Sequence, residues 1–183
     1  MAAFEANLAA LLQNGQLLQV KKKTSLLLEG EVCHKVFLIE QGIVRSWFNN
    51  DGDDITFQFY FAGDIVTSSQ SLKSQKAALY NIEALTDVRL KVLNKAQVLA
   101  LLTAAPALQQ WVNEYVAERL YHYQKLFISR IKNNPQQRYE ELLASQPEIF
   151  DFVPHHYIAS YLGMTPVSLS RIRAKKNSSI NNC

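Results

Sequence analysis

The 183-residue sequence has few cysteines and no long apolar run, and each scarcity excludes a class of protein. Cys33 and Cys183 are the only cysteines, so one chain cannot supply the four thiolates of an iron–sulfur cluster. Two distant cysteines indicate free thiols in a reducing compartment, and we expect a cytoplasmic protein. No segment stays apolar over the roughly 20 residues that a membrane-spanning helix needs. The N-terminus lacks the basic start of a signal peptide, and residues 4–12 have the apolar spacing of a helix instead.

Acidic side chains are absent from residues 154–183. This stretch carries four basic residues and has a net charge of +4, whereas the preceding 153 residues carry 15 basic and 16 acidic side chains. A small basic tail on a nearly neutral body favours double-stranded DNA as a partner, because Lys and Arg gain affinity by releasing the counterions of the phosphates. The tail has no apolar stripe that would insert into a membrane surface, so we expect no membrane partner.

The same tail contains a two-helix pattern between residues 155 and 176, HHYIASYLGMTPVSLSRIRAKK. Gly163 stands where a chain leaves a helix in the left-handed conformation. Thr165 can cap the next helix, and Pro166 fits its first position. Apolar residues are spaced to face one another across the two helices: Ile158, Ala159 and Leu162 on the first, Leu169 and Ile172 on the second. The pattern predicts a helix-turn-helix, whose second helix enters the DNA major groove; an ordinary helical hairpin is the alternative.

Upstream of this pattern, short runs rich in β-branched and aromatic residues are separated by turn sequences. The runs cover residues 17–23, 25–28, 36–40, 43–49, 55–61, 80–84 and 88–93. Asp51-Gly52 between two apolar runs is a strong hairpin signal. About seven or eight short antiparallel strands are typical of a barrel or jelly roll. The predicted fold class is therefore α+β, with an N-terminal jelly-roll barrel of double-stranded β-helix type.

The barrel is followed by helical patterns. Asn94 and Gln97 resemble a capping box for a short helix. Pro106 opens a pattern of roughly 27 residues that ends at 133 and would span on the order of 40 Å. Its apolar positions are too many for one seam, which favours a helix that packs on its own barrel with one side and on a second copy with the other. The alternative is a helix covered entirely by its own chain. We predict two domains: residues 1–133, with a dimerisation helix at 106–133, and a helix-turn-helix domain at 134–183.

A jelly roll can also be a metal-dependent enzyme of cupin type, which needs His and carboxylate ligands clustered on inward-facing strands. The histidines are scattered instead, at His34, His122, His155 and His156. No Ser–His–Asp or nucleophilic Cys arrangement is suggested either. We therefore expect no metal site and no catalysis.

Barrel, long helix and helix-turn-helix occur in this order in the Crp/Fnr family of bacterial transcription regulators, which the sequence resembles. The resemblance is carried by residues 29–31, 37–42, 61–64, 84–86 and 158–173, and the ending is most similar to short regulators of Bacteroidetes-type bacteria. It implies a cyclic-nucleotide-binding-like sensor domain, a homodimer, binding to double-stranded DNA and RNA polymerase as a further partner.

The resemblance also places a ligand pocket in the barrel, at Gly63, Asp64, Thr67, Ser68, Ser69, Ala78 and Leu79. The family's ribose-binding Glu would fall on Ser68 and its phosphate-binding Arg on Ala78, so both anchors are missing. Without a cation, a buried cyclic phosphate would lose its hydration with little in return, and we expect no tight cyclic AMP binding. The hydroxyl groups before the cassette helix leave two alternatives open: an unidentified small-molecule effector or a ligand-free barrel. No cofactor is expected.

The residues expected at the DNA are Thr165, Pro166, Val167, Ser168, Ser170, Arg171, Arg173, Lys175 and Lys176. Arg171 is the candidate base reader, because Arg to guanine is the commonest specific pair; a solvated surface Arg is the alternative. Val167 would suit a thymine methyl group, and Arg173, Lys175 and Lys176 the phosphates. The second functional hypothesis is a ligand sensor that acts through protein contacts without specific DNA binding.

Overall fold

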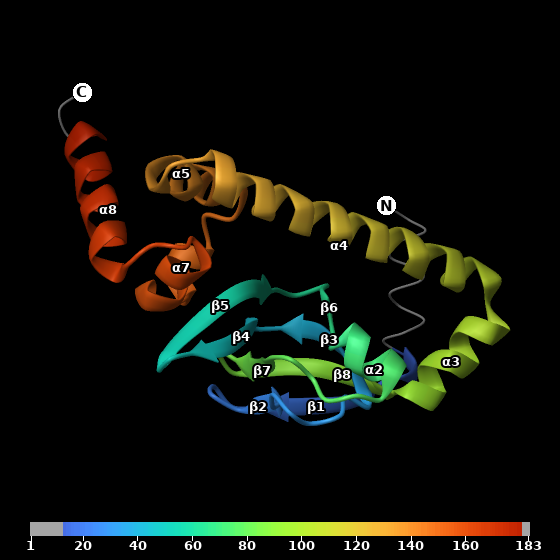
Figure 1. Cartoon of the computed structure of the whole chain (residues 1–183). Coiled ribbons are helices and arrows are strands. Elements are labelled where there is room, and N and C mark those ends of the chain that lie inside the picture. Colours follow the sequence, from blue (N-terminus) through green and yellow to red (C-terminus); the bar gives the residue numbers. More distant parts are fainter. Residues whose placement is uncertain (1–12, 181–183) are drawn as a thin grey trace. The chain divides into compact units, whose positions relative to one another are not determined.

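The computed structural model describes residues 13–180, with backbone only for 176–180. The helix expected over residues 4–12 lies outside the described residues. Within them, the strands form two four-stranded sheets, in the orders β1-β8-β3-β6 and β2-β7-β4-β5 (Figure 1). The strands are β1 (Gln16–Val20), β2 (Ser25–Leu27), β3 (Lys35–Gln41), β4 (Val44–Asn50), β5 (Asp53–Tyr60), β6 (Ile65–Val66), β7 (Asn81–Ala84) and β8 (Val88–Asn94). The predicted jelly roll is confirmed.

Alternating side chains of the two sheets form the barrel core. Phe37, Ile39 and Leu90 come from one sheet and Val44 and Ile82 from the other, and all are buried. Because successive strand residues point to opposite faces, every second position enters this core. The pairing is antiparallel in both sheets, as in β3 with β8 and β4 with β7.

The outer face of the barrel is covered by the first half of a long helix, α4 (Pro106–Lys132). Leu108 and Trp111 of this helix pack with Leu38 of β3. The hydroxyl of Tyr115 accepts the backbone N–H of Ile65 at 3.1 Å, which attaches α4 to β6 as well. Before α4 come α2 (Ser69–Ser74) and α3 (Lys95–Ala104), and the latter begins with the predicted capping box of Asn94 and Gln97.

Four further helices follow in the described part of the chain: α5 (Pro135–Ser145), α6 (Ile149–Phe152), α7 (His155–Tyr161) and α8 (Pro166–Ile180). The chain divides into two compact units, residues 1–48 with 58–119 and residues 49–57 with 120–183. Within the second unit, the backbone N–H of Thr56 donates to the hydroxyl of Ser160 at 3.1 Å. The predicted domain boundary at residue 133, where α4 ends, stays a prediction. None of the described helices is long and apolar enough to cross a bilayer.

Candidate nucleic-acid interface

The turn between α7 and α8 ends α7 in a Schellman motif. Gly163 has φ +64°, its N–H donates to the carbonyl of Ser160, and the N–H of Met164 donates to the carbonyl of Ala159. This pair of bonds satisfies carbonyls that a helix end otherwise leaves without partners, and it requires a left-handed residue. Glycine adopts that conformation without strain, so the chain turns sharply at the predicted position.

The start of α8 is capped as the sequence predicts. The hydroxyl of Thr165 accepts the N–H of Ser168 at 3.2 Å and lies 3.0 Å from the hydroxyl of the same residue. Pro166 is the first residue of the helix, where an absent N–H costs nothing. The cap fixes the first turn of α8, and in a helix-turn-helix this turn carries the side chains that reach base edges.

The two helices cross through the predicted apolar face. Ile158, Ala159 and Leu162 of the α7 segment are buried, as is Leu169 of α8, whereas Ile172 is half-buried. With these side chains inside, the opposite face of α8 is turned outward. Val167 is 59 % exposed in the first turn of this helix.

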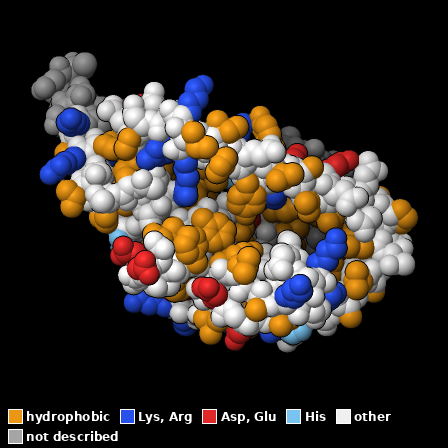
Figure 2. Space-filling view, in the orientation of Figure 1, with side chains coloured by type: hydrophobic (Ala, Val, Ile, Leu, Met, Phe, Trp, Pro, Cys, Tyr) orange, Lys and Arg blue, Asp and Glu red, His pale blue; other side chains and the backbone are white. Residues whose placement is uncertain are grey.

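The candidate DNA-contacting residues fall into three groups by exposure. Exposed side chains are those of Thr165, Pro166, Val167, Ser170, Arg171 and Lys175. Ser168 is half-buried because it takes part in the cap. Arg173 is half-buried as well: its guanidinium contacts the ring of His155 and lies 5.8 Å from the ring centre of Phe150. The side chain of Lys176 lies outside the described part. Figure 2 shows Lys and Arg side chains gathered over the C-terminal helices.

Two arginines at the base of this interface were missed by sequence reasoning. Arg130 of α4 and Arg138 of α5 donate to the backbone carbonyls of Tyr161, Leu162 and Gly163. Because every residue has a carbonyl, a side chain that binds one leaves no partner pattern in the sequence. The sequence therefore contained no pattern that could have identified these two arginines.

Two polar side chains of the candidate ligand pocket, Asp64 and Thr67, already have partners within the barrel. The Asp64 carboxylate accepts the N–H of Phe61 at 2.9 Å, and Gly63 adopts φ +92° in the same turn. The Thr67 hydroxyl donates to the carbonyl of Lys35 at 2.9 Å. These contacts show that Gly63 and Asp64 stabilise the turn between β5 and β6, a structural role that needs no ligand.

At the positions of the family's two anchors, the structure has small buried side chains. Ser68 and Ala78 are both buried, Ser69 is exposed, and Leu79 is 71 % exposed. Arg45 is a buried cation of the barrel, and its guanidinium is paired with Glu83 at 2.7 Å. An anion at Ser68 and Ala78 would therefore meet a methyl group and a hydroxyl. Among the described residues, no group of three or more His, Cys, Asp or Glu side chains is placed to hold a metal ion.

Comparisons with known proteins agree with this architecture. Residues 17–105 match the cyclic nucleotide-binding domain family. No curated protein matches the sequence. The chain is similar in structure to FixK2 from Bradyrhizobium japonicum, with 17% identity, a TM-score of 0.78 and coverage of 90% of this chain and 85% of that one.

Two further solved structures extend the likeness over nearly the whole chain. A mutant of CooA from Carboxydothermus hydrogenoformans has 18% identity, a TM-score of 0.72 and coverage of 93% of this chain and 79% of that one. A putative transcriptional regulator of the crp/fnr family from Eubacterium rectale has 18% identity, a TM-score of 0.66 and coverage of 98% and 84%. Residues 17–105 thus match a cyclic nucleotide-binding domain, and a helical region follows them. Its fold is that of the Crp/Fnr-type regulators, as the sequence resemblance predicted.

Proposed function

We propose that this protein is a dimeric, sequence-specific DNA-binding transcription regulator. The observation that carries the proposal is the outer face of α8, where Arg171 and Val167 are exposed beside a capped first turn while Leu169 is buried. This face offers a bidentate donor for guanine and an apolar contact for a thymine methyl. Residues 154–183 contain no carboxylate side chain that would repel the phosphates.

Dimerisation is supported by the second half of α4. Val116, Leu120, Tyr123, Phe127 and Ile131 recur at intervals of three or four residues and so lie on one side of the helix. They are exposed in the single chain, with 67 % exposure at Phe127 and 73 % at Ile131. Figure 2 shows hydrophobic side chains along this helix. A stripe with this spacing suits a two-helix seam, and a two-fold dimer presents two recognition helices to half-sites one DNA turn apart.

The sensor barrel of the proposed regulator does not bind cyclic AMP tightly, because Ser68 and Ala78 supply neither a carboxylate for the ribose nor a cation for the phosphate. Lys73 and Lys76 are exposed, and an ammonium group lacks the planar fork that binds a phosphate through two bonds. Calorimetric titration should show no saturable heat with cyclic AMP at micromolar concentrations. Tight binding in that range would contradict this part of the proposal.

Binding-site selection on random duplex DNA tests the function itself. A regulator of this kind should enrich a two-fold symmetric site, and its affinity for that site should exceed its affinity for random DNA at two salt concentrations. Both affinities should fall as salt rises. Equal affinity for selected and random DNA would favour the alternative, a ligand sensor that acts through protein contacts.

A further inference from the structure

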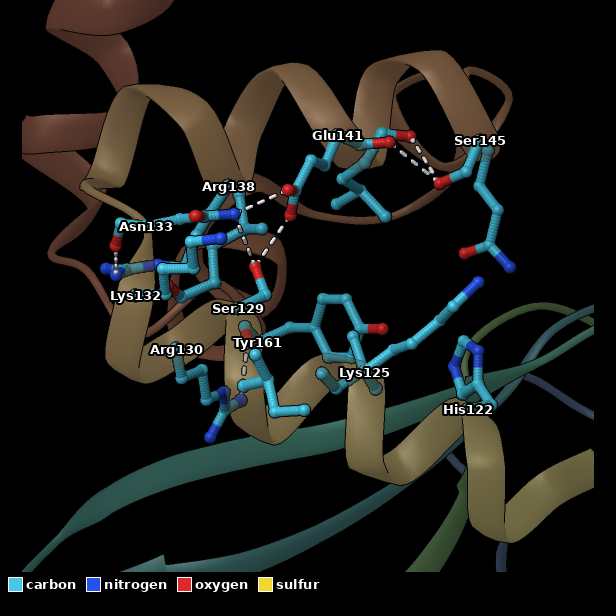
Figure 3. Close-up of a pocket in the computed structure, with 15 residues that line it drawn as sticks. His122, Lys125, Ser129, Arg130, Lys132, Asn133, Arg138, Glu141, Ser145 and Tyr161 are labelled. Carbon is cyan, nitrogen blue, oxygen red and sulfur yellow. Dashed lines mark hydrogen bonds between the residues drawn. The ribbon is translucent and has the colours of Figure 1, made fainter.

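The C-terminal end of α7 is held by two arginines from other helices. Nη2 of Arg130 donates to the carbonyl of Tyr161 at 2.6 Å. Arg138 donates to the next two carbonyls, from Nε to Leu162 at 2.8 Å and from Nη2 to Gly163 at 3.3 Å. Figure 3 shows Arg130 and Arg138 around Tyr161. Three successive carbonyls at the turn of the helix-turn-helix therefore receive charge-assisted hydrogen bonds, which are stronger than neutral ones.

The same arginines connect this turn to the end of α4. Arg130 belongs to the last turn of α4, and Nη1 of Arg138 donates to the carbonyl of Asn133 at 2.7 Å. Glu141 of α5 accepts hydrogen bonds from Ser129 at 2.6 Å and from Asn133 (Figure 3). All these groups lie within one compact unit. Hydrogen bonds from residues of both helices thus stabilise the connection between α4 and α5.

Side chains do not fill all the space beside the α4–α5 connection. A cavity of about 700 Å³ lies between α4, α5 and the end of α7, lined in part by Leu126, Leu142 and Leu162. At this point the hydrogen bonds of Arg130 and Arg138 link the end of α7 to α4 and to the α4–α5 connection.

The guanidinium group of Arg130 is retained here at an electrostatic cost. Burial lowers the pKa of Arg130; the nearby Tyr161 raises it, and the charge of Arg138 lowers it further. An arginine nevertheless stays charged. None of the described carboxylates forms a salt bridge with either arginine. Their charges are balanced by backbone carbonyls at a helix C-terminus, where the helix dipole favours cations.

From this geometry we propose that Arg130 and Arg138 are positioning residues for DNA recognition, an inference that rests on the proposed function. They hold the turn at residues 161–163 against the end of α4, so that α8 projects from α4 in one direction. In a dimer joined along α4, the distance between the two recognition helices then follows from α4 itself. The arginines touch no DNA; they set which half-site spacing the dimer accepts.

The test uses the full chain, the selected operator and a series of operators whose half-sites are moved by one or two base pairs. The variants are Arg138→Gln and Arg130→Gln, with Lys132→Gln as the matched control. Lys132 lines the same cavity, and in the described part of the chain its ammonium group donates no hydrogen bond. The wild type and the control should prefer one spacing. Each arginine variant should bind the preferred operator about tenfold more weakly, as expected for the loss of a charged hydrogen bond, and should discriminate less among spacings.

The salt dependence of affinity and the Arg138→Lys variant distinguish a positioning role from a direct contact with DNA. The slope of affinity against salt should stay the same in Arg138→Gln, because no phosphate contact is lost. Arg138→Lys keeps the charge but not the fork, so it should restore only part of the affinity. The proposal is overturned by an unchanged spacing profile, by a slope reduced by about one phosphate contact, or by an equal effect of Lys132→Gln.

Hydrogen exchange of the free protein tests the arginine contacts without DNA. Amides in residues 163–169 should exchange faster in both arginine variants than in the wild type and Lys132→Gln, because the turn loses its attachment. Equal exchange in all four proteins overturns the inference. If instead the wild type selects no DNA site while the exchange difference is present, the proposed function fails and the attachment of the turn stands.

Discussion

The α7–α8 pair and the segment at residues 63–79, the candidate ligand pocket, differ in where they place their polar groups. At α8 Leu169 is buried, and Ser170 and Arg171 are exposed. In residues 63–79 the polar groups are used within the barrel: Thr67 donates to a backbone carbonyl, and the Ser71 hydroxyl donates to the carbonyl of Lys76. Ser170 and Arg171 therefore present donors at the surface, whereas Thr67 and Ser71 donate within the barrel. A domain family describes a fold, and binding has to be argued from the groups that remain available.

The largest effect is expected where the proposed DNA-binding region is most buried. Leu169→Ala should destabilise the C-terminal unit by about 2–5 kcal/mol, because a fully buried leucine leaves a cavity. Both tryptophans, Trp47 and Trp111, lie in the barrel unit, so fluorescence reports on that unit. Circular dichroism at 222 nm reports mainly on helices. The expected result is an earlier loss of helical signal with an unchanged fluorescence transition.

Val167→Ala is the control for this variant, because Val167 is on the same helix but exposed. Its effect on stability should stay within about 0.5 kcal/mol. If Leu169→Ala and Val167→Ala were equally stable, α7 and α8 would not pack as a compact pair.

Arg171→Ala tests the exposed side of the same region. Loss of a bidentate contact to guanine should cost about 1–3 kcal/mol on the selected operator and relax the preference at one base position. Affinity for random DNA should change little. Arg89→Ala is a suitable control, because Arg89 is a barrel residue paired with Glu40 at 2.9 Å. Unchanged discrimination between operator and random DNA in Arg171→Ala would remove its role as a base reader.

Gly163→Ala should have a smaller effect, of about 1–2 kcal/mol, on the stability of the C-terminal unit. An added Cβ meets no atom within 4 Å, so the cost comes from the left-handed backbone alone, at φ +64°. Asparagine tolerates this conformation better, and Gly163→Asn should lose less stability than Gly163→Ala. Urea denaturation followed by circular dichroism measures both. The reverse order of the two variants would contradict a purely conformational cost.

Local signals made much of this architecture predictable. Asn94 with Gln97 indicated the start of α3, and Gly163 with Pro166 the turn between α7 and α8, because each acts through its own backbone or its near neighbours. The sequence did not reveal β6, with two residues, or α6, with four, because neither is long enough to show a period. Nor did it reveal that Arg45 is buried against Glu83 or that Arg138 binds carbonyls at the turn. Those contacts join distant segments and depend on the completed fold.

The smallest expected effect concerns the pH dependence of the C-terminal unit. Partial burial lowers the pKa of His155, and the neighbouring Arg173 lowers it further. The unfolded chain then binds a proton more readily than the folded one, so stability should decline as the pH falls below about 6.5, the ordinary histidine pKa. The effect should be modest, because the ring of His155 is largely exposed. His155→Gln should flatten the stability difference between pH 5 and pH 7.5, whereas the neighbouring His156→Gln should leave the His155 contribution in place. Urea denaturation at the two pH values measures this, and an unaltered pH dependence in His155→Gln would show that its contact with Arg173 does not matter for stability.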